Sequence, residues 1–326
     1  MLAVRSLTLA VRCWRPGART ILWAMVRLIS SAIVMVALSA GAFAQERPPI
    51  LGVAHIALKT NDLAAAREYY GKYLGFAEAF TIPNADGSPE VIYFKVNDHQ
   101  YIEVFPGLKS ETEDRLSHIA FETTDAEQLR AYLASHGVAV PAALRTLPDG
   151  NLSFTIKDPD GHTVEFVQYV PTGPLGRTFG KFMPASRISD HIGHVGFTVS
   201  DRAAADRLFK DILGFHDVWH GGMKDDGPTQ WVDMRVPNGM DHLEYMLEVH
   251  NPTPRTLGVM NHLCLIVPSV AESYKTLLAR DMKMEAPKIG RDGKWQLNLY
   301  DPNLTRGELM EPKPVQKPCC SEMMEK

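Results

Sequence analysis

One pattern recurs four times between Gly52 and Pro312, and it constrains the fold more than any other feature of the chain. Each copy opens with a short apolar strand that carries a histidine, and a helix-start signal follows. The histidines are His55, His118, His194 and His262, and the expected helix N-caps are Asp62, Asp125, Asp201 and Ser269. A period of this kind indicates repeated supersecondary units.

The rest of each copy predicts two or three further strands. Copies one and three end their helices with Leu-Gly-Phe, at 74–76 and 213–215, and strands are expected over 90–96, 100–105, 230–236 and 242–247. Copies two and four end in strand, turn and strand, with turns at 158–161 and 301–303. We therefore expect an α+β fold of four βαβββ modules.

A glutamate lies 46 to 50 residues after each histidine, in an apolar last strand. These residues are Glu103, Glu165, Glu244 and Glu308. A carboxylate among apolar residues is costly unless it is paired or bound to a cation. Two imidazoles with two carboxylates suit a divalent metal ion such as Zn, Ni, Co, Mn or Fe(II). The competing interpretation is a hydrogen-bonded core histidine and a glutamate on the solvated face of an edge strand.

The first 44 residues differ from the rest, with five arginines, no acidic residue and an apolar run that ends in Ala42-Phe43-Ala44. This layout is typical of a secretory signal peptide, and we expect cleavage after Ala44 and an exported, periplasmic or extracellular protein. An uncleaved N-terminal anchor is the alternative. Met25 would also open a signal of ordinary length, which leaves the true start codon open.

Loss of the five arginines changes the formal net charge from −4 to −9, which gives no reason to expect nucleic acid or anionic lipid as a partner. We expect a small-molecule substrate and no stable membrane span after cleavage. The sequence does not decide whether the protein forms a homodimer. The domains are expected over 50–170 and 190–312, joined by a Pro- and Gly-rich linker over 171–189 and followed by a flexible tail over 313–326.

The modules resemble the vicinal oxygen chelate (VOC) superfamily, which includes glyoxalase I, extradiol dioxygenases and bleomycin resistance proteins. The four histidine strands, residues 62–76 with their Leu-Gly-Phe, and residues 158–166 carry the resemblance, which covers about 51–312. It implies two tandem glyoxalase-like domains, each of paired modules with a metal on its concave face. Pairing of copies one with two and three with four is simplest; one with four and two with three, or pairing across a dimer, stays open.

The resemblance implies three functions. A glyoxalase-like lyase or isomerase would use all eight His and Glu residues as ligands, with a glutamate as base, so that Glu165, Glu244 and Glu308 are the expected catalytic residues. An Fe(II) extradiol-type dioxygenase would need only His194, His262 and Glu308. A non-catalytic resistance-type binding protein often lacks the ligands, which counts against that class here.

Several other residues remain open from sequence alone. Cys264 takes a position where the other copies carry Ala57, Ala120 and Gly196, and is either a small filler or a reactive thiol. Cys319 and Cys320 could bind metal, form disulfides between chains or lie without a role in an exposed tail. His242 is either near the metal or exposed. The remaining histidines are expected in solvated turns or helix ends: His99, His136, His162, His191, His216, His220 and His250.

Export can be tested directly. Mass spectrometry of the exported protein should find an N-terminus at Gln45, because the small residues before it fit a signal-peptidase site. A cytosolic chain that retains the arginine-rich leader would contradict this expectation.

Overall fold

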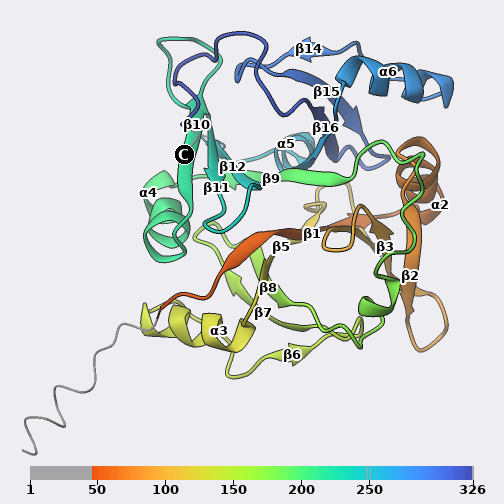
Figure 1. The fold of residues 1–326 in the computed structure, drawn as a ribbon, viewed down its shortest axis with the longest axis vertical. Helices are drawn as coiled ribbons and strands as arrows, with labels where there is room; N and C mark the ends of the chain where they lie inside the picture. The colour runs from red at the N-terminus through yellow and green to blue at the C-terminus, as the bar shows by residue number, and fades with distance from the viewer. Residues whose placement is uncertain (1–45, 248, 250, 325–326) are drawn as a thin grey trace, which may run out of the picture. The chain divides into compact units, whose positions relative to one another are not determined.

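The computed structural model describes residues 46–247, 249 and 251–324, so the predicted signal over 1–44 and His250 lie outside the described residues. Two eight-stranded sheets are formed (Figure 1), in the orders β2-β3-β4-β1-β5-β8-β7-β6 and β10-β11-β12-β9-β13-β16-β15-β14. Among the described residues, no helix is long and apolar enough to cross a membrane.

The first sheet holds copies one and two, and the second holds copies three and four. The strands of the first sheet are β1 Ile50–Thr60, β2 Ala77–Pro83, β3 Pro89–Lys95, β4 Tyr101–Pro106, β5 Leu116–Thr123, β6 Arg145–Thr146, β7 Leu152–Lys157 and β8 Thr163–Gln168. The second sheet comprises β9 His191–Val199, β10 His216–Gly221, β11 Trp231–Arg235, β12 His242–Leu247, β13 His262–Ile266, β14 Lys288–Ile289, β15 Trp295–Tyr300 and β16 Arg306–Met310. The simplest pairing of copies is therefore the one observed.

Each copy contributes one helix between its first and second strands, which completes the predicted βαβββ order. The helices of the copies are α2 Leu63–Ala66 continued by the π-helix η1 Arg67–Tyr73, α3 Ala126–Ser135, α4 Arg202–Asp206 continued by the π-helix η3 Arg207–Ile212, and α6 Val270–Ala279. The 3₁₀ turn η2 Gly176–Thr178 and the helix α5 Pro254–Met260 lie between copies. The first of the three later strands in each copy was not located from sequence.

The helix boundaries follow the sequence signals. Each expected N-cap accepts a hydrogen bond from the backbone N–H three residues later, which confirms all four caps. The Leu-Gly-Phe motifs place Gly75 and Gly214 at φ of 77° and 78° directly after the π-helical turns. A side chain would be strained at both positions, which explains the glycine.

Residues 47–326 form one compact unit, and most of the buried apolar side chains of both sheets belong to one cluster. Helices from different halves meet in pairs, α3 with η3 and η1 with α6 (Figure 1). Tyr132 donates to the carbonyl of Ile212, and Arg280 donates to the carbonyl of Tyr73. Phe121 and Phe215 pack edge to face with centroids 5.2 Å apart. The two sheets thus share their core.

The turns of copies two and four dock onto the opposite half. Asp160 accepts from the backbone N–H of Ser200, while Asn303 accepts from the hydroxyl of Thr60 at 2.6 Å. The buried aspartate that starts each turn is satisfied differently. Asp158 lies 2.8 Å from Nδ1 of His162 in its own turn.

The matching aspartate of copy four takes its partner from the other half. The hydroxyl of Tyr70 on η1 donates to Asp301 at 3.1 Å. Phe209 occupies the position in copy three that corresponds to Tyr70 and has no hydroxyl to offer. The two seams between the halves are therefore related by the repeat but differ chemically.

A buried polar cluster joins β1, β9 and the β11–β12 connection. Asp241 accepts from the backbone N–H of Val53 at 2.8 Å and from the side-chain amide of Gln100 at 3.1 Å, and it pairs with His191 at 2.8 Å. The amide of Gln100 also donates to the carbonyl of Ile192 and accepts from its N–H. One carboxylate thus completes the backbone hydrogen bonds where the two central strands meet.

Some sequence expectations differ from the structure. His191 begins β9, directly before the expected strand residues, and His216 and His220 lie in β10, a strand that was not located from sequence, rather than in turns or helix ends. His162 lies in its turn, as expected, but its side chain is mostly buried against Asp158.

The C-terminal residues make contacts that composition did not anticipate. Cys319 and Cys320 form a disulfide with each other, an arrangement that the sequence analysis did not consider. The carbonyl of Cys319 accepts from Trp219, and Ser321 and Met324 bond to the backbone of β10. Flexibility of the whole segment 313–326 stays a prediction.

Replacement of Asp241 by Ala should destabilise the protein by about 1–3 kcal/mol, because it leaves the buried Val53 N–H without an acceptor and removes one of the acceptors of the Gln100 amide. Urea unfolding measures this loss. Lys275→Ala, which removes an exposed ion pair with Glu272, is the control and should change stability by less than about 0.5 kcal/mol.

The same variant should alter the pH dependence of stability. Hydrogen bonding to Asp241 raises the pKa of His191 above its ordinary value. The pair therefore stabilises the fold fully below a pH of about 6.5, and this contribution is lost as the pH rises through the raised pKa. The stability difference between wild type and variant should narrow over that interval, and a constant difference would contradict the assignment.

Candidate metal centres

The same register of strand pairing recurs in all four copies, and it places a glutamate beside each histidine. In every copy the first strand runs parallel to the last, and the residue two positions after the histidine lies opposite the glutamate. The four opposed pairs are Ala57 with Glu103, Ala120 with Glu165, Gly196 with Glu244 and Cys264 with Glu308. Since strand residues two apart share a face, each histidine and its glutamate point to the same side of the sheet.

The two histidine strands of each sheet are antiparallel neighbours, which brings the two pairs together. His55 lies opposite Ala120, and Ala57 lies opposite His118. The four central strands β4, β1, β5 and β8 therefore carry one candidate ligand each, and β12, β9, β13 and β16 repeat the arrangement. The sequence spacing alone could suggest this grouping, but only the register places all four side chains on one face.

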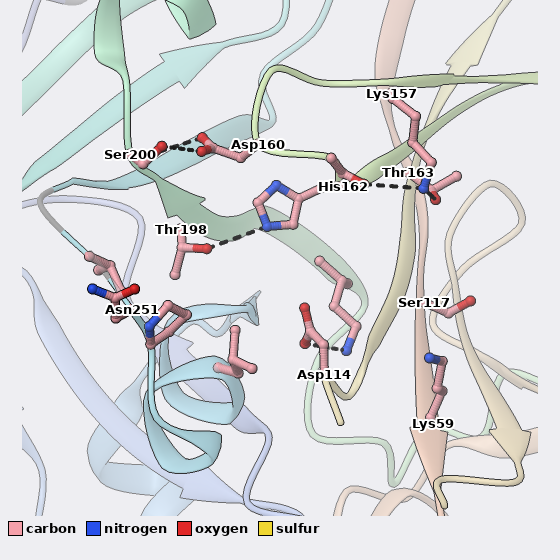
Figure 2. Close-up of a pocket in the computed structure, with 15 residues that line it drawn as sticks. Lys59, Asp114, Ser117, Lys157, Asp160, His162, Thr163, Thr198, Ser200 and Asn251 are labelled. Atoms are coloured by element: carbon pink, nitrogen blue, oxygen red, sulfur yellow. Dashed lines mark hydrogen bonds between the residues drawn. The ribbon is translucent and has the colours of Figure 1, made fainter. Parts of the chain in front are cut away.

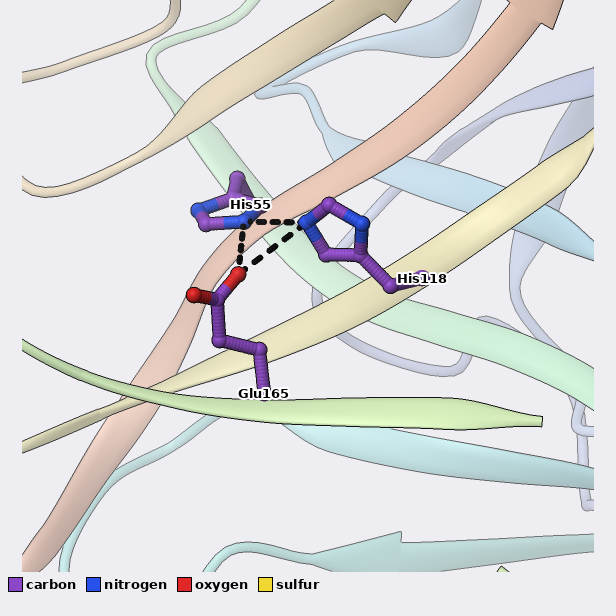
Figure 3. Close-up of side chains that lie close together, drawn as sticks. All are labelled: His55, His118 and Glu165. Carbon is purple, nitrogen blue, oxygen red and sulfur yellow. Dashed lines mark hydrogen bonds and ion pairs between the residues drawn. The ribbon is translucent and has the colours of Figure 1, made fainter. Parts of the chain in front are cut away.

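The first group is formed by His55, Glu103, His118 and Glu165. The Nε2 atoms of the two histidines lie 2.9 Å apart, and Oε2 of Glu165 lies 3.2 Å and 3.1 Å from them. Glu103 approaches the same atoms at 3.6 Å and 3.8 Å. Figure 3 shows the two rings and Glu165 converging from β1, β5 and β8. His55, His118 and Glu165 thus lie close enough to share an ion, and Glu103 is somewhat farther from the two histidines.

The second group is formed by His194, Glu244, His262 and Glu308. The Nε2 atoms of its histidines lie 3.2 Å apart. Oε2 of Glu244 lies 3.0 Å from His262 and 3.8 Å from His194, and Oε2 of Glu308 lies 3.5 Å from His194. Across the two groups six of the eight side chains are buried, while His118 and Glu244 are partly exposed.

The charges of the first group depend on one another. Burial opposes protonation of His55, yet Glu103 and Glu165 outweigh it and raise the pKa of His55 to about 9. Burial also opposes ionisation of Glu165, but its contacts with His118 and His55 hold the pKa of this carboxyl well below its usual range. Buried carboxylates in this group therefore require a positive charge beside them, which a proton or a metal ion can supply.

The second group is arranged differently. Burial opposes ionisation of Glu244, but His262 and Arg306 outweigh it and lower its pKa to about 2. Burial and the nearby Arg306 lower the pKa of His262. Nδ1 of His262 lies 2.8 Å from the carbonyl of Met260, which fixes the proton of the neutral ring on Nδ1 and leaves Nε2 free to coordinate.

Two small residues make room for the histidine rings. A methyl group at Gly196 would lie 2.2 Å from the ring of His262, so this strand position needs a glycine. Cys264, at the corresponding place on β13, is buried, and burial raises the pKa of its thiol to about 11. The thiol is therefore protonated near neutral pH, which agrees with the filler interpretation. It also lies close enough to His194 and Glu308 to share a cation with them.

Sequence reasoning missed three polar residues around the second group. Asp233 on β11 lies opposite Glu244, Asn298 on β15 lies opposite Glu308, and Arg306 precedes Glu308 by two residues. Burial, followed by the negative charge of Glu244, raises the pKa of Asp233 to about 7. An aspartate within the apolar run Trp231-Val232-Asp233-Met234 was the available signal. His242 is partly buried on β12, and burial lowers its pKa to about 3.

A cavity of about 740 Å³ lies where the turn over 158–161 meets β9, and none of the eight candidate ligands lines it. Figure 2 shows His162 directed toward Thr198, at 3.4 Å, with Asp160 bonded to Ser200. Lys157 is bonded within its own turn. The contacts of His162 with Thr198 and of Asp160 with Ser200 join the two halves.

Comparison with known proteins agrees with the module structure. Residues 52–166 match the family described as Glyoxalase/Bleomycin resistance protein/Dioxygenase superfamily. The chain is 28% identical over 237 residues to a protein named iron-dependent extradiol dioxygenase from Rhodococcus jostii (strain RHA1), covering 62% of this chain and 73% of that one. It is 30% identical over 120 residues to the uncharacterized protein YwbC of Bacillus subtilis (strain 168), covering 35% and 94%.

Two solved structures share the fold. The 2,3-dioxygenase LapB from Pseudomonas sp. KL28 superposes with a TM-score of 0.60 at 15% identity, covering 84% of this chain and 97% of that one. The Mn(II)-bound glyoxalase from Novosphingobium aromaticivorans gives 0.61 at 16% identity, covering 81% and 83%. Together with the four βαβββ modules and the candidate His and Glu ligands for a divalent metal, these matches show that the chain belongs to the glyoxalase/bleomycin resistance protein/dioxygenase superfamily.

Proposed function

We propose that this chain is a metal-dependent lyase or isomerase that acts by proton transfer on a small oxygen-chelating substrate. The observation that carries the proposal is that two histidines and two glutamates approach one another at each centre, with three of the four close enough to share an ion. An octahedral ion held by two histidines and two carboxylates keeps about two positions free, which suffices for two vicinal substrate oxygens. Oxygen-activating Fe(II) sites instead use two histidines and one carboxylate and keep more positions open.

The residues fit a divalent ion at both centres. Oε1 of Glu165 and Oε2 of Glu244 are buried and have no hydrogen-bond partner among the described residues. A buried carboxylate oxygen without such a partner is costly, and a cation coordinated by it removes the cost. Two carboxylates also balance the charge of a divalent ion. The native ion stays open among Zn, Ni, Co, Mn and Fe(II).

When bound, the ion would act as a Lewis acid toward a substrate oxygen. The chain's own contribution is to place the bases. The side chain of Glu244 as a whole is partly exposed and lines a cavity at the second centre, so Glu244 is suited to accept a substrate proton. His262 is held by the carbonyl of Met260 and Glu308 is buried, so both keep their places while the proton moves. Glu165 has the equivalent of the Glu308 position in the first centre.

Ring cleavage by Fe(II) is the second candidate, and the match to the Rhodococcus jostii protein supports it. At the second centre Nη2 of Arg306 lies 3.8 Å from Oε2 of Glu244. An ion pair with Arg306 could hold Glu244 away from the ion and leave His194, His262 and Glu308 as the three ligands. Export of the mature chain and a homodimer are further proposals that rest on the leader and the family.

The purified mature protein should bind up to two divalent ions per chain. Chelation should lower its thermal stability, since an ion at about 100 times its Kd stabilises the native state by about 2.7 kcal/mol. Metal analysis and calorimetry measure the two quantities. His55→Ala with His118→Ala should remove one ion and leave the second centre loaded. Absence of metal together with unchanged melting on chelation would eliminate both enzyme proposals.

Replacement of Glu244 by Gln distinguishes the two reactions. Under proton transfer, the variant should lose activity at the second centre by about 10²-fold or more while retaining part of its metal through His194, His262 and Glu308. Under ring cleavage, substantial activity should remain, Fe(II) should be required and O₂ should be consumed. His262→Ala should abolish both reactions, and Glu103→Gln is the matched control at the first centre. Oxygen uptake with a catechol that survives Glu244→Gln would overturn the lyase or isomerase proposal.

A further inference from the structure

A cavity of about 310 Å³ opens onto Glu244 and Glu308 of the second centre. Its volume is near the lower end of the range for small-molecule sites. Beside the two glutamates its lining includes the polar residues Asp233, Asn298 and Arg306 and the aromatic side chains of Trp219 and Trp231. Asp292 also lines the cavity, with its carboxylate 3.7 Å from Nζ of Lys294. The ligands of the metal thus form only part of the wall, and the remainder must meet whatever the ion holds.

Three atoms of these polar residues lack a partner. Oδ1 of Asp233, Oδ1 of Asn298 and Nε of Arg306 are buried and make no hydrogen bond within the described part of the chain. An unpaired buried polar atom costs about 1–3 kcal/mol, more when the group is charged. Three such atoms on residues around one cavity are therefore expensive in the free protein, and a bound molecule with matching groups would relieve that cost.

The first centre has different residues at the corresponding positions. Tyr93 lies opposite Glu103 where Asp233 lies opposite Glu244, and Thr155 lies opposite Glu165 where Asn298 lies opposite Glu308. Thr163 precedes Glu165 by two residues in the first sheet. Arg306 takes the same place before Glu308 in the second sheet. The ligand sets match, but at these three positions only the second centre has an acid, an amide and a guanidinium. These three positions therefore distinguish the second centre from the first.

The chemistry of a matching ligand follows from the three atoms. Oδ1 of Asp233 and Oδ1 of Asn298 accept hydrogen bonds, so the ligand must offer donors such as hydroxyl groups. The guanidinium of Arg306 only donates, and its planar fork suits a carboxylate. Its only ion pair among the described residues is the long contact of 3.8 Å with Glu244.

We propose that the second centre binds a small hydroxylated carboxylic acid, with its carboxylate on Arg306 and its hydroxyl groups on Asp233 and Asn298. This inference rests on the proposed function only in that a divalent ion occupies the adjoining ligands. Asp233, Asn298 and Arg306 are then the residues that determine substrate class. Trp219 and Trp231 form the apolar wall and report occupancy through their fluorescence.

The test uses the metal-loaded mature protein with glycerate, tartrate and gluconate as probes. Glycerol and glucose carry hydroxyl groups without a carboxylate, and propionate carries a carboxylate without hydroxyl groups. At least one hydroxy acid should bind ten times more tightly than all three controls, measured by calorimetry and by tryptophan fluorescence. Metal content is measured after each titration, because these acids also chelate free ions.

The variants separate the roles of the residues. Arg306→Gln should weaken binding of the hydroxy acid at least tenfold without changing the binding of glucose, and Arg306→Lys should restore part of the loss. Asn298→Leu should weaken the hydroxy acid and leave propionate unchanged. Thr163→Val, the matched change at the first centre, should alter none of these. Titrations of the metal-free protein should retain the dependence on Arg306 at lower affinity.

The outcomes are distinguishable from those of the metal tests. Two ions per chain with no binding of any hydroxy acid, or with equal binding to wild type and Arg306→Gln, would overturn this inference and leave the proposed function standing. A protein that binds no divalent ion would overturn the proposed function. In that case, Arg306-dependent binding to the metal-free chain would still support the recognition of a hydroxylated acid.

Discussion

The register of the parallel pairing between the first and last strand of each module is the constraint on which both centres depend. Strand side chains alternate between faces, so a slip of one residue would turn a glutamate away from its histidine and place it on the opposite side of the sheet. The register recurs in all four modules, with the glutamate always opposite the second residue after the histidine. Small residues at that second position, Gly196 above all, leave room for the ring of the neighbouring strand.

Two centres with the same ligands need not have the same chemistry. At the first, two histidines and Glu165 form a tight group, and the charges of Glu103 and Glu165 raise the pKa of His55 against the opposing effect of burial. At the second, Arg306 and a buried Asp233 add a positive and an acidic group beside Glu244. Electrostatics in a low-dielectric site depends strongly on such neighbours. The differences between the halves therefore support the proposal that the second centre is the one that selects a substrate.

The sequence predicted the modules, the helix caps and the grouping of His with Glu because these follow from spacing and local backbone chemistry. Asp62 and its three counterparts cap helices as their positions require, and Gly75 adopts the left-handed backbone that its motif indicates. The surroundings of the centres were not predictable in the same way. Asp233 and Asn298 reach them only through hairpin registers, and Asp241 binds Val53 across 188 residues of chain. Long-range contacts of this kind leave no local signature in one sequence.

The unequal partners of the two turn aspartates bear on how the halves relate to each other. Asp158 is satisfied within its own turn by His162, whereas Asp301 uses the hydroxyl of Tyr70 from the first half. Two copies of the first half could not reproduce this seam, since each Asp158 would already be bound and each Tyr70 would lose its acceptor. Two copies of the second half would lack the phenol altogether, because Phe209 stands there. The two halves are therefore not interchangeable at this seam, because the phenol and the carboxylate that it joins come from unlike halves of the chain.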